Sequence, residues 1–280
     1  MLEYLKAVLF GIVEGITEWL PVSSTGHLIL LDEFIKLDVS EAFYEMFQVV
    51  IQLGAILAVI ALFFHKLNPF APSKSQAEKK NTWSLWFKVV AAVLPSAILG
   101  LLLDDWLDAK LYNAWVVAAM LVLYGVAFLF VEKQNQNRSF AITNVHAIDY
   151  RTAILIGAFQ CLSLIPGTSR SGATILGAIF LGISRSAGAE FSFFLAIPTM
   201  LGASLLKVLK FMLEGVKATG GEMLILLVGT VVSFVVSLLV IKALMDYVRK
   251  RSFAAFGYYR IVLGFVVIGY FLVKSLLTGA

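Results

Sequence analysis

Residues 11–27 read Gly-Ile-Val-Glu-Gly-Ile-Thr-Glu-Trp-Leu-Pro-Val-Ser-Ser-Thr-Gly-His and join apolar residues to a polar, proline-containing turn. It lies in an apolar region, residues 5–31, that is interrupted from Pro21 to Gly26. A second apolar region, residues 152–183, is interrupted by Pro166-Gly-Thr-Ser-Arg-Ser-Gly172. Because proline ends a helix, each region leaves two pieces that are too short to cross a membrane. The interruptions therefore predict two re-entrant helical hairpins.

The two interrupted regions also resemble each other at a constant spacing of 146 residues. The matching pairs are Gly11 with Gly157, Glu14 with Gln160, Thr17 with Ser163, Ser23 with Ser169, Thr25 with Ser171 and Gly26 with Gly172. Three longer apolar segments follow each copy, and an odd number of crossings makes the second copy enter from the opposite face. We therefore predict an inverted repeat within one structural domain, with residues 1–131 as the first copy, 132–151 as a cytoplasmic linker and 152–280 as the second copy.

Composition indicates an integral membrane protein. Of its 280 residues 60% are hydrophobic and only 14% charged, and the mean hydropathy is +0.90. This excludes a soluble enzyme and a disordered chain, while the single cysteine, Cys161, excludes a disulfide scaffold and a cysteine metal site. Six segments are long enough to cross: residues 44–64, 86–103, 113–131, 190–213, 223–245 and 259–277. The predicted fold class is an all-α integral membrane protein with six transmembrane helices plus the two hairpins.

Loop charges predict the orientation. Lysine and arginine concentrate in the loops 65–85, 132–151 and 246–258, which the positive-inside rule places in the cytoplasm. The intervening loops carry one base each and lie outside, so the first hairpin enters from outside and the second from inside. Irregular backbone at membrane depth needs protein or water around it, so we expect the two tips to meet around a polar cavity. The basic residues are spread over these loops, which argues against nucleic acid as a partner.

The first hairpin carries two carboxylates and a polar turn. Glu14 and Glu18 lie four residues apart on one helix face, where a divalent cation, a shared proton or a cationic partner would stabilise them. The alternative is a pair that merely contacts water. After Pro21 come Ser23, Ser24, Thr25, Gly26 and His27. Their hydroxyls and amides suit phosphate oxygens, although the same residues also suit a simple helix cap. His27 could exchange protons or form a structural hydrogen bond.

The second hairpin adds a cation. Arg170 lies among Gly167, Thr168, Ser169, Ser171, Gly172 and Thr174, a composition typical of an anion site. The planar guanidinium binds phosphate at two points, and within a membrane it needs either such an anion or a carboxylate. A purely structural ion pair between Arg170 and Glu18 is the alternative. The combination of carboxylates, hydroxyls, histidine and arginine on paired tips is more specific than any part.

These motifs carry a resemblance to a known family. Glu14-Gly-Ile-Thr-Glu18, Pro21-Val-Ser-Ser-Thr-Gly-His27 and Pro166-Gly-Thr-Ser-Arg-Ser-Gly-Ala-Thr174 resemble the bacterial undecaprenyl pyrophosphate phosphatases associated with bacitracin resistance. The likeness extends over essentially the whole chain, including Phe47-Gln-Val-Val-Ile-Gln-Leu-Gly54 and Glu190-Phe-Ser-Phe193. It implies a multi-pass enzyme of the bacterial plasma membrane that removes the terminal phosphate from the C55 lipid pyrophosphate. The monophosphate product is the lipid carrier that peptidoglycan synthesis reuses, and the active site would face the extracytoplasmic side.

The resemblance also assigns roles by position. Glu18, Ser24, His27 and Arg170 become the expected catalytic residues, and a divalent cation, Mg²⁺ or Ca²⁺, would bind Glu14 and Glu18. We expect substrate contacts from Glu14, Ser23, Thr25, Gly26, Gly167, Thr168, Ser169, Ser171 and Thr174. The lipid substrate and the surrounding membrane lipid are the expected partners, and the sequence leaves a homodimer open.

Two questions stay open at this level. Ser24 could attack the phosphorus with help from His27 or Glu18 and form a phosphoseryl intermediate. Attack by His27 or by water is equally consistent with the sequence. A polyprenyl-phosphate transporter or flippase is the alternative function, because inverted repeats with broken helices also describe secondary transporters. A noncatalytic scaffold would leave the carboxylates without a purpose. The concentration of acid, base, hydroxyl and arginine at the hairpins favours the phosphatase.

Overall fold

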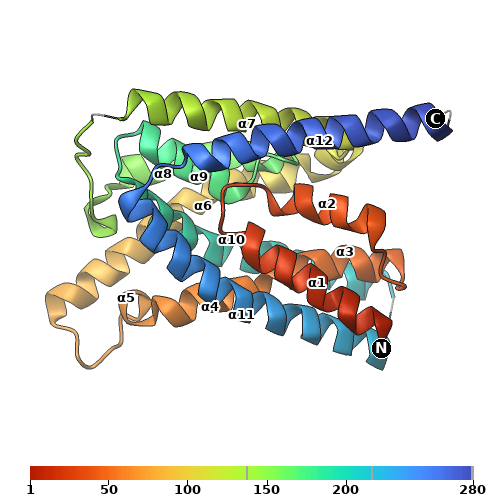
Figure 1. Ribbon diagram of the computed structural model, residues 1–280. Helices are drawn as coiled ribbons and strands as arrows, with labels where there is room; N and C mark the ends of the chain where they lie inside the picture. Colours follow the sequence, from red (N-terminus) through yellow and green to blue (C-terminus); the bar gives the residue numbers. More distant parts are fainter. Residues whose placement is uncertain (137, 216, 279–280) are drawn as a thin grey trace.

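The computed structural model describes residues 1–136, 138–215 and 217–278, and this part of the chain is helical (Figure 1). Its only β-type pairing is an isolated bridge between Ile142 and Ile183. The elements are α1 (Leu2–Thr17), α2 (Ser24–Phe34), α3 (Glu41–Val50), α4 (Gln52–Leu62), α5 (Phe64–Leu67), α6 (Gln76–Leu111), α7 (Ala114–Gln134), η1 (Val145–Ala147), α8 (Tyr150–Cys161), η2 (Leu162–Leu164), α9 (Arg170–Phe180), α10 (Arg185–Leu213), α11 (Gly220–Lys250) and α12 (Ala254–Thr278).

Six of the described segments are long and apolar enough to cross a membrane, which confirms the predicted number and places. They are Glu41–Leu62, Gln76–Leu103, Ala114–Gln134, Arg185–Leu213, Gly220–Lys250 and Ala254–Leu277. The predicted second span started at residue 86, ten residues too late. Ser75 and Glu78 form a reciprocal capping box that starts α6 in a polar stretch, where hydropathy carries no signal. The protein is thus a multi-pass helical membrane protein.

The two interrupted regions each form a pair of shorter helices. Figure 1 shows α1 and α2 running in opposite directions, joined by the turn at residues 18–23. In the second region, α8 continues into η2 and the chain then turns into α9. Both turns contain the proline that the sequence places there, after the end of α1 in the first region and after the end of η2 in the second. We call the turn residues 18–23 the first tip and 165–169 the second tip.

Close helix packing fixes α1, which carries Glu14 and leads directly into Glu18. A Cβ on Gly11 would lie 2.6 Å from the carbonyl oxygen of Gly229, so α1 and α11 approach at backbone distance. On the other side of α11, a Cβ on Gly54 of α4 would lie 2.1 Å from the carbonyl oxygen of Thr230. Membrane helices associate through such small residues because the lipid supplies no hydrophobic drive between them. Helix α11 therefore packs closely against both α1 and α4 and fixes their positions relative to each other.

Candidate active site

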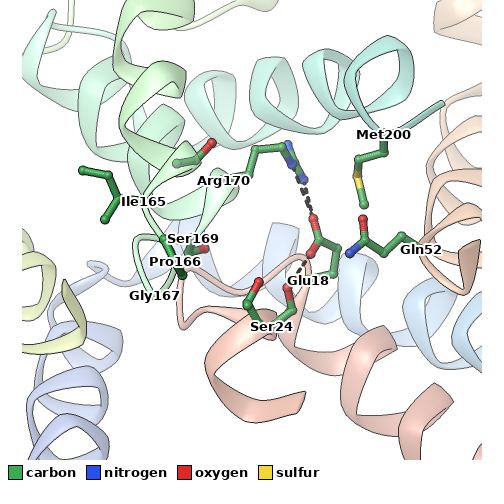
Figure 2. A pocket seen from close by; sticks show the side chains of 11 residues that line it. Glu18, Ser24, Gln52, Ile165, Pro166, Gly167, Ser169, Arg170 and Met200 are labelled. Carbon is green, nitrogen blue, oxygen red and sulfur yellow. Dashed lines mark hydrogen bonds and ion pairs between the residues drawn. The ribbon is translucent and has the colours of Figure 1, made fainter. Parts of the chain in front are cut away.

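The two tips meet at a cavity of about 120 Å³, shown in Figure 2. Its lining combines both hairpins with α4 and α10: Glu18, Ser24, Thr25, Gln52, Ser163, Ile165, Pro166, Gly167, Ser169, Arg170 and Met200. Three of the four predicted catalytic residues, Glu18, Ser24 and Arg170, belong to this set. The polar cavity expected between the hairpin tips is therefore present.

Glu18 lies at the centre of the hydrogen bonds that cross the cavity. It directly follows α1, and its backbone N–H donates to the Glu14 carbonyl, so its side chain continues the helix face. Ser24 Oγ donates to Glu18 Oε2 at 2.7 Å, and Arg170 Nη2 donates to Glu18 Oε1 at 3.1 Å (Figure 2). One carboxylate thus contacts both a hydroxyl of its own hairpin and the guanidinium of the other.

Arg170 is held from three sides. Its Nη1 donates to the Ser192 carbonyl at 2.7 Å, and its guanidinium carbon lies 5.6 Å from the centroid of the Trp19 ring. Trp19 is itself buried and packs edge-on against Phe193. Hydrogen bonds and a cation–π contact therefore aim the guanidinium at Glu18 and leave it little rotational freedom.

Both tips contain a serine with a left-handed backbone. The φ angles are 74° at Ser23 and 72° at Ser169, and these are the only residues other than glycine with positive φ among those described. Each serine caps the helix that follows, since Ser23 Oγ accepts from the Gly26 N–H and Ser169 Oγ accepts from the Gly172 N–H. A side chain in this region is uncommon, and the strained conformation persists only where surrounding contacts enforce it.

Glu14 is completely buried one turn before Glu18. Neither of its carboxylate oxygens has a hydrogen-bond partner in the part of the chain that the structure describes. A buried carboxylate without a partner is costly, so this position fits a cation or a proton better than an empty environment. Within the described residues no group of three or more His, Cys, Asp or Glu side chains converges on one point. Two carboxylates suit Mg²⁺, which keeps several waters and is completed by substrate phosphates.

His27 lies apart from the other predicted catalytic residues and does not line the cavity. Its Nδ1 is 2.7 Å from the Ser23 carbonyl, which can only accept, so we assign the ring proton to Nδ1. Its Nε2 then accepts from the Tyr259 hydroxyl at 2.7 Å, and the two rings stack with an interplanar angle of 2°. Both ring nitrogens are therefore engaged in contacts that hold the first tip against α12.

The predicted substrate-contact residues divide into two groups. Thr25, Gly167 and Ser169 line the cavity. The others support its walls: Ser23 and Gly26 form the helix cap, Ser171 Oγ lies 3.0 Å from the Glu18 carbonyl, Thr174 Oγ1 lies 2.6 Å from Ser192 Oγ, and the Thr168 hydroxyl is buried without a hydrogen-bond partner in the described chain. Glu14 likewise lies outside the lining.

Two residues at the site were not singled out from the sequence. Gln52 begins α4 and points toward Glu18 across the cavity (Figure 2). Arg260 lies at the start of α12, fully buried against both tips. The available signal was a polar side chain inside a predicted span, which usually marks a functional position. Gln52 and Arg260 lie inside predicted spans, whereas the predicted site residues lie in the two interrupted regions.

Comparisons with known proteins place the chain in a family. The family described as bacitracin resistance protein BacA matches residues 7–266. Relatives described as undecaprenyl-diphosphatase include one from Limosilactobacillus fermentum, 60% identical over 97% of this chain and 98% of its own length. Another, from Enterococcus faecalis, is 58% identical over 95% of this chain and 97% of its own. A third, from Lactiplantibacillus plantarum, is 59% identical over 97% of this chain and 98% of its own length.

The family match covers both hairpin tips and all residues that line the cavity. The relatives align over nearly their full lengths, so the likeness concerns the whole fold and not a single motif. The chain belongs to the bacitracin resistance protein BacA family.

Proposed function

We propose that this protein hydrolyses undecaprenyl diphosphate to undecaprenyl phosphate and inorganic phosphate at the cavity between the two tips. Its membership of the family, at 58–60% identity to undecaprenyl-diphosphatases, makes it an integral membrane phosphatase of the same kind. The observation that carries the assignment to this cavity is the Glu18 carboxylate, which contacts Ser24 and Arg170 at once. The reaction regenerates the lipid carrier for peptidoglycan synthesis and so counters bacitracin.

Ser24 is the proposed nucleophile and Glu18 its base. The Ser24 O–H already donates to Glu18, so attack of Oγ on the terminal phosphorus passes its proton to that carboxylate. The anhydride bond breaks, undecaprenyl phosphate leaves, and a phosphoseryl group remains. Water then hydrolyses this ester, releases inorganic phosphate and restores the hydroxyl. The engagement of both His27 nitrogens supports Glu18 over His27 as the base.

Arg170 is the proposed electrostatic partner of the phosphates. Its fork can bind two phosphate oxygens, and the hydroxyls of Thr25 and Ser169 line the same cavity. Negative charge builds up on the bridging oxygen as the anhydride bond breaks, and a fixed guanidinium stabilises that charge. Because Arg170 pairs with Glu18 before substrate arrives, phosphate binding would free the carboxylate to accept the proton.

Glu14 and Glu18 are the proposed holders of Mg²⁺ or Ca²⁺. Their hard oxygen donors and the partnerless Glu14 carboxylate support this assignment. When bound, the cation would neutralise phosphate charge as a Lewis acid. Glu14 lies in the last turn of α1 and Glu18 directly follows that helix, so the two carboxylates lie one turn apart.

The two hairpins are proposed to be re-entrant copies of an inverted repeat. The strained cap serines Ser23 and Ser169 lie 146 positions apart, the spacing at which the sequence repeats, and their φ angles differ by only 2°. This likeness supports a common origin for the two tips. We propose further that the site opens to the extracytoplasmic face of the bacterial plasma membrane, as the distribution of lysine and arginine over the loops favours.

The test is phosphate release from undecaprenyl diphosphate by the purified protein in detergent, with Mg²⁺ and with chelator. We expect chelator-sensitive release that Glu18→Ala, Ser24→Ala and Arg170→Ala each abolish. Glu45→Gln, which changes an exposed carboxylate on α3, and Ser204→Ala, which changes a serine outside the cavity, should retain the activity. No release from folded wild-type protein would refute the proposal and favour a lipid transporter.

A further inference from the structure

Arg260 is a buried cation that no carboxylate pairs with among the described residues. Its side chain is fully inaccessible, whereas the partly buried arginines Arg170 and Arg185 each pair with a glutamate. No carboxylate is among the hydrogen-bond partners of Arg260 in the part of the chain that the structure describes. Burying a charge without a counter-ion is costly, so the position calls for a compensating role.

The compensation comes from backbone carbonyls of three separate segments. Arg260 Nη1 donates to the first tip, and Nη2 donates to the second tip and to α7, while Nε lies at the limit of hydrogen bonding to α7. The acceptors are the carbonyl oxygens of Pro21 at 3.0 Å, Gly167 at 2.8 Å, Thr168 at 3.0 Å, Met120 at 3.3 Å and Leu121 at 3.5 Å. The ring of Tyr124 adds a cation–π contact at 5.4 Å.

This geometry needs a guanidinium. Arginine presents five N–H donors in one rigid plane, and they reach carbonyls on both tips at the same time. A lysine ammonium in the same place is a point charge with three donors. The guanidinium is also closely fitted, since a Cβ added to Gly172 in the first turn of α9 would lie 3.2 Å from Arg260 Nη1.

The contact with Thr168 bears directly on the cavity. All described peptide bonds are trans, so the Thr168 carbonyl and the Ser169 N–H of one peptide point in opposite directions. With the carbonyl bound to Arg260, the N–H of Ser169 points away from Arg260, and it has no hydrogen-bond acceptor in the described chain. Ser169 lines the cavity in its strained conformation. Arg260 therefore fixes the orientation of a free backbone donor at the site.

The preceding residue of α12 acts on the same region. Tyr259 donates to His27, whose Nδ1–H donates to the carbonyl of the strained Ser23. Helix α12 thus reaches the first tip directly through Arg260 and indirectly through Tyr259 and His27, and it contacts two carbonyls of the second tip through Arg260. Neither Tyr259 nor Arg260 lines the cavity, so both act through the backbone of the tips.

We propose that Arg260 is a positioning residue for the hydrolysis reaction: its guanidinium ties the two tips together and holds the peptides around Ser169 and Ser24 in the arrangement that catalysis requires. This inference rests on the site assigned under the proposed function. Displacement of reacting groups by about 1 Å can cost about 100-fold in rate, so we expect Arg260→Ala to lower kcat by about that factor. KM should change much less, because the side chain does not line the cavity.

The experiment combines kinetics with hydrogen–deuterium exchange of the full-length protein in detergent. Arg260→Ala should exchange faster at residues 18–26 and 165–172 than wild type, with unchanged exchange in the middle of α11. Added guanidinium or methylguanidinium should restore part of its kcat and slow the exchange at both tips, without raising the kcat of wild type. Arg260→Lys keeps a charge at the position and should show the same lower kcat and faster exchange, which added guanidinium should not restore. This variant replaces Arg260→Ala in the experiment if Arg260→Ala does not fold.

The outcomes separate this inference from the proposed function. Wild-type kcat and wild-type exchange in the folded Ala or Lys variant would overturn the positioning role. A lower melting temperature with unchanged kcat would also overturn it, because that result describes ordinary packing. If wild-type protein releases no phosphate, the proposed function fails, whereas the exchange measurements still decide whether Arg260 ties the tips.

Discussion

Arg170 Nη2 lies 3.1 Å from Glu18 Oε1 although 152 positions separate the two residues in the sequence. The pair joins two hairpins that are otherwise distant along the chain, and it leaves the second carboxylate oxygen to accept the Ser24 proton. A charge pair of this kind organises the site before substrate binds, and it gives each partner a distinct function once phosphate enters the cavity.

Replacing Glu18 with glutamine tests its role as base. The amide keeps the shape and the contact with Arg170 but cannot take the Ser24 proton, so kcat should fall by about 10²- to 10⁴-fold. Steady-state phosphate release measures the effect, with Glu45→Gln as the matched surface control. A Glu18→Gln enzyme within about threefold of wild type would assign the proton transfer to another group.

The chemistry of the trapped intermediate identifies the nucleophile. Acid quench of the enzyme during turnover of substrate labelled in its terminal phosphate should leave label on Ser24, as an acid-stable phosphate ester. Mass spectrometry of the digest locates it, and Ser24→Ala should carry none. Label on His27 that survives an alkaline quench of a parallel sample but is lost in acid would reverse the assignment. Turnover without any adduct, even in rapid-quench samples, would favour direct attack by water.

The partnerless Glu14 carboxylate leads to a prediction about stability. Glu14→Gln replaces a buried charge with a neutral amide. The free energy of unfolding of the metal-free variant should therefore exceed that of metal-free wild type by about 1–3 kcal/mol. Mg²⁺ should raise the melting temperature of wild type but not of the variant, since only the wild-type site binds the cation. Thermal denaturation with and without chelator checks both effects. Equal stabilisation by Mg²⁺ in the two proteins would place the cation elsewhere.

A second buried carboxylate, Glu132, is expected to be structural. It accepts hydrogen bonds from both Nε and Nη2 of Arg185 and one from the Phe253 N–H at 2.9 Å, and thereby connects α7, α10 and the start of α12. Glu132→Ala leaves the guanidinium and the N–H without an acceptor and should cost about 3–5 kcal/mol of unfolding free energy. Asp246→Ala, which removes an exposed pair with Arg249, should cost less than about 1 kcal/mol. Denaturation in mixed detergent measures both, and similar losses would contradict the expectation.

His146, in the loop before α8, gives a pH dependence outside the membrane spans. Burial, followed by the charges of Lys66 and Lys88, lowers its pKa below 6.5, although Glu190 opposes them. The unfolded chain therefore takes up this proton first as the pH falls, so the contribution of neutral His146 is complete above about pH 6.5 and is lost below it. His146→Gln should flatten the acid side of the stability curve, whereas His65→Gln, at an exposed position, should not. Identical stability curves for wild type and His146→Gln on the acid side would rule out this contribution of His146.

The features that sequence reasoning predicted are those that depend on local pattern. Six crossings follow from runs of apolar residues, and Glu18, Ser24 and Arg170 stand out because charge and hydroxyls interrupt such runs. The ring of His27 turns instead toward Tyr259, a contact across 232 positions that no spacing reveals. The partners of Arg260 are backbone carbonyls, which every residue possesses, so its role depends entirely on how the helices pack.

The size of the cavity has a pharmacological consequence. Pockets that enclose drug-sized molecules usually measure about 300–1,000 Å³, whereas the space between the tips is about 120 Å³ and is bordered by a fixed ion pair. It has room for an anionic group the size of a phosphate, and Arg170 and the lining hydroxyls favour such a group. A competitive inhibitor would therefore need to be an amphiphile, with a compact anionic head for the cavity and a flexible chain that remains dissolved in the bilayer.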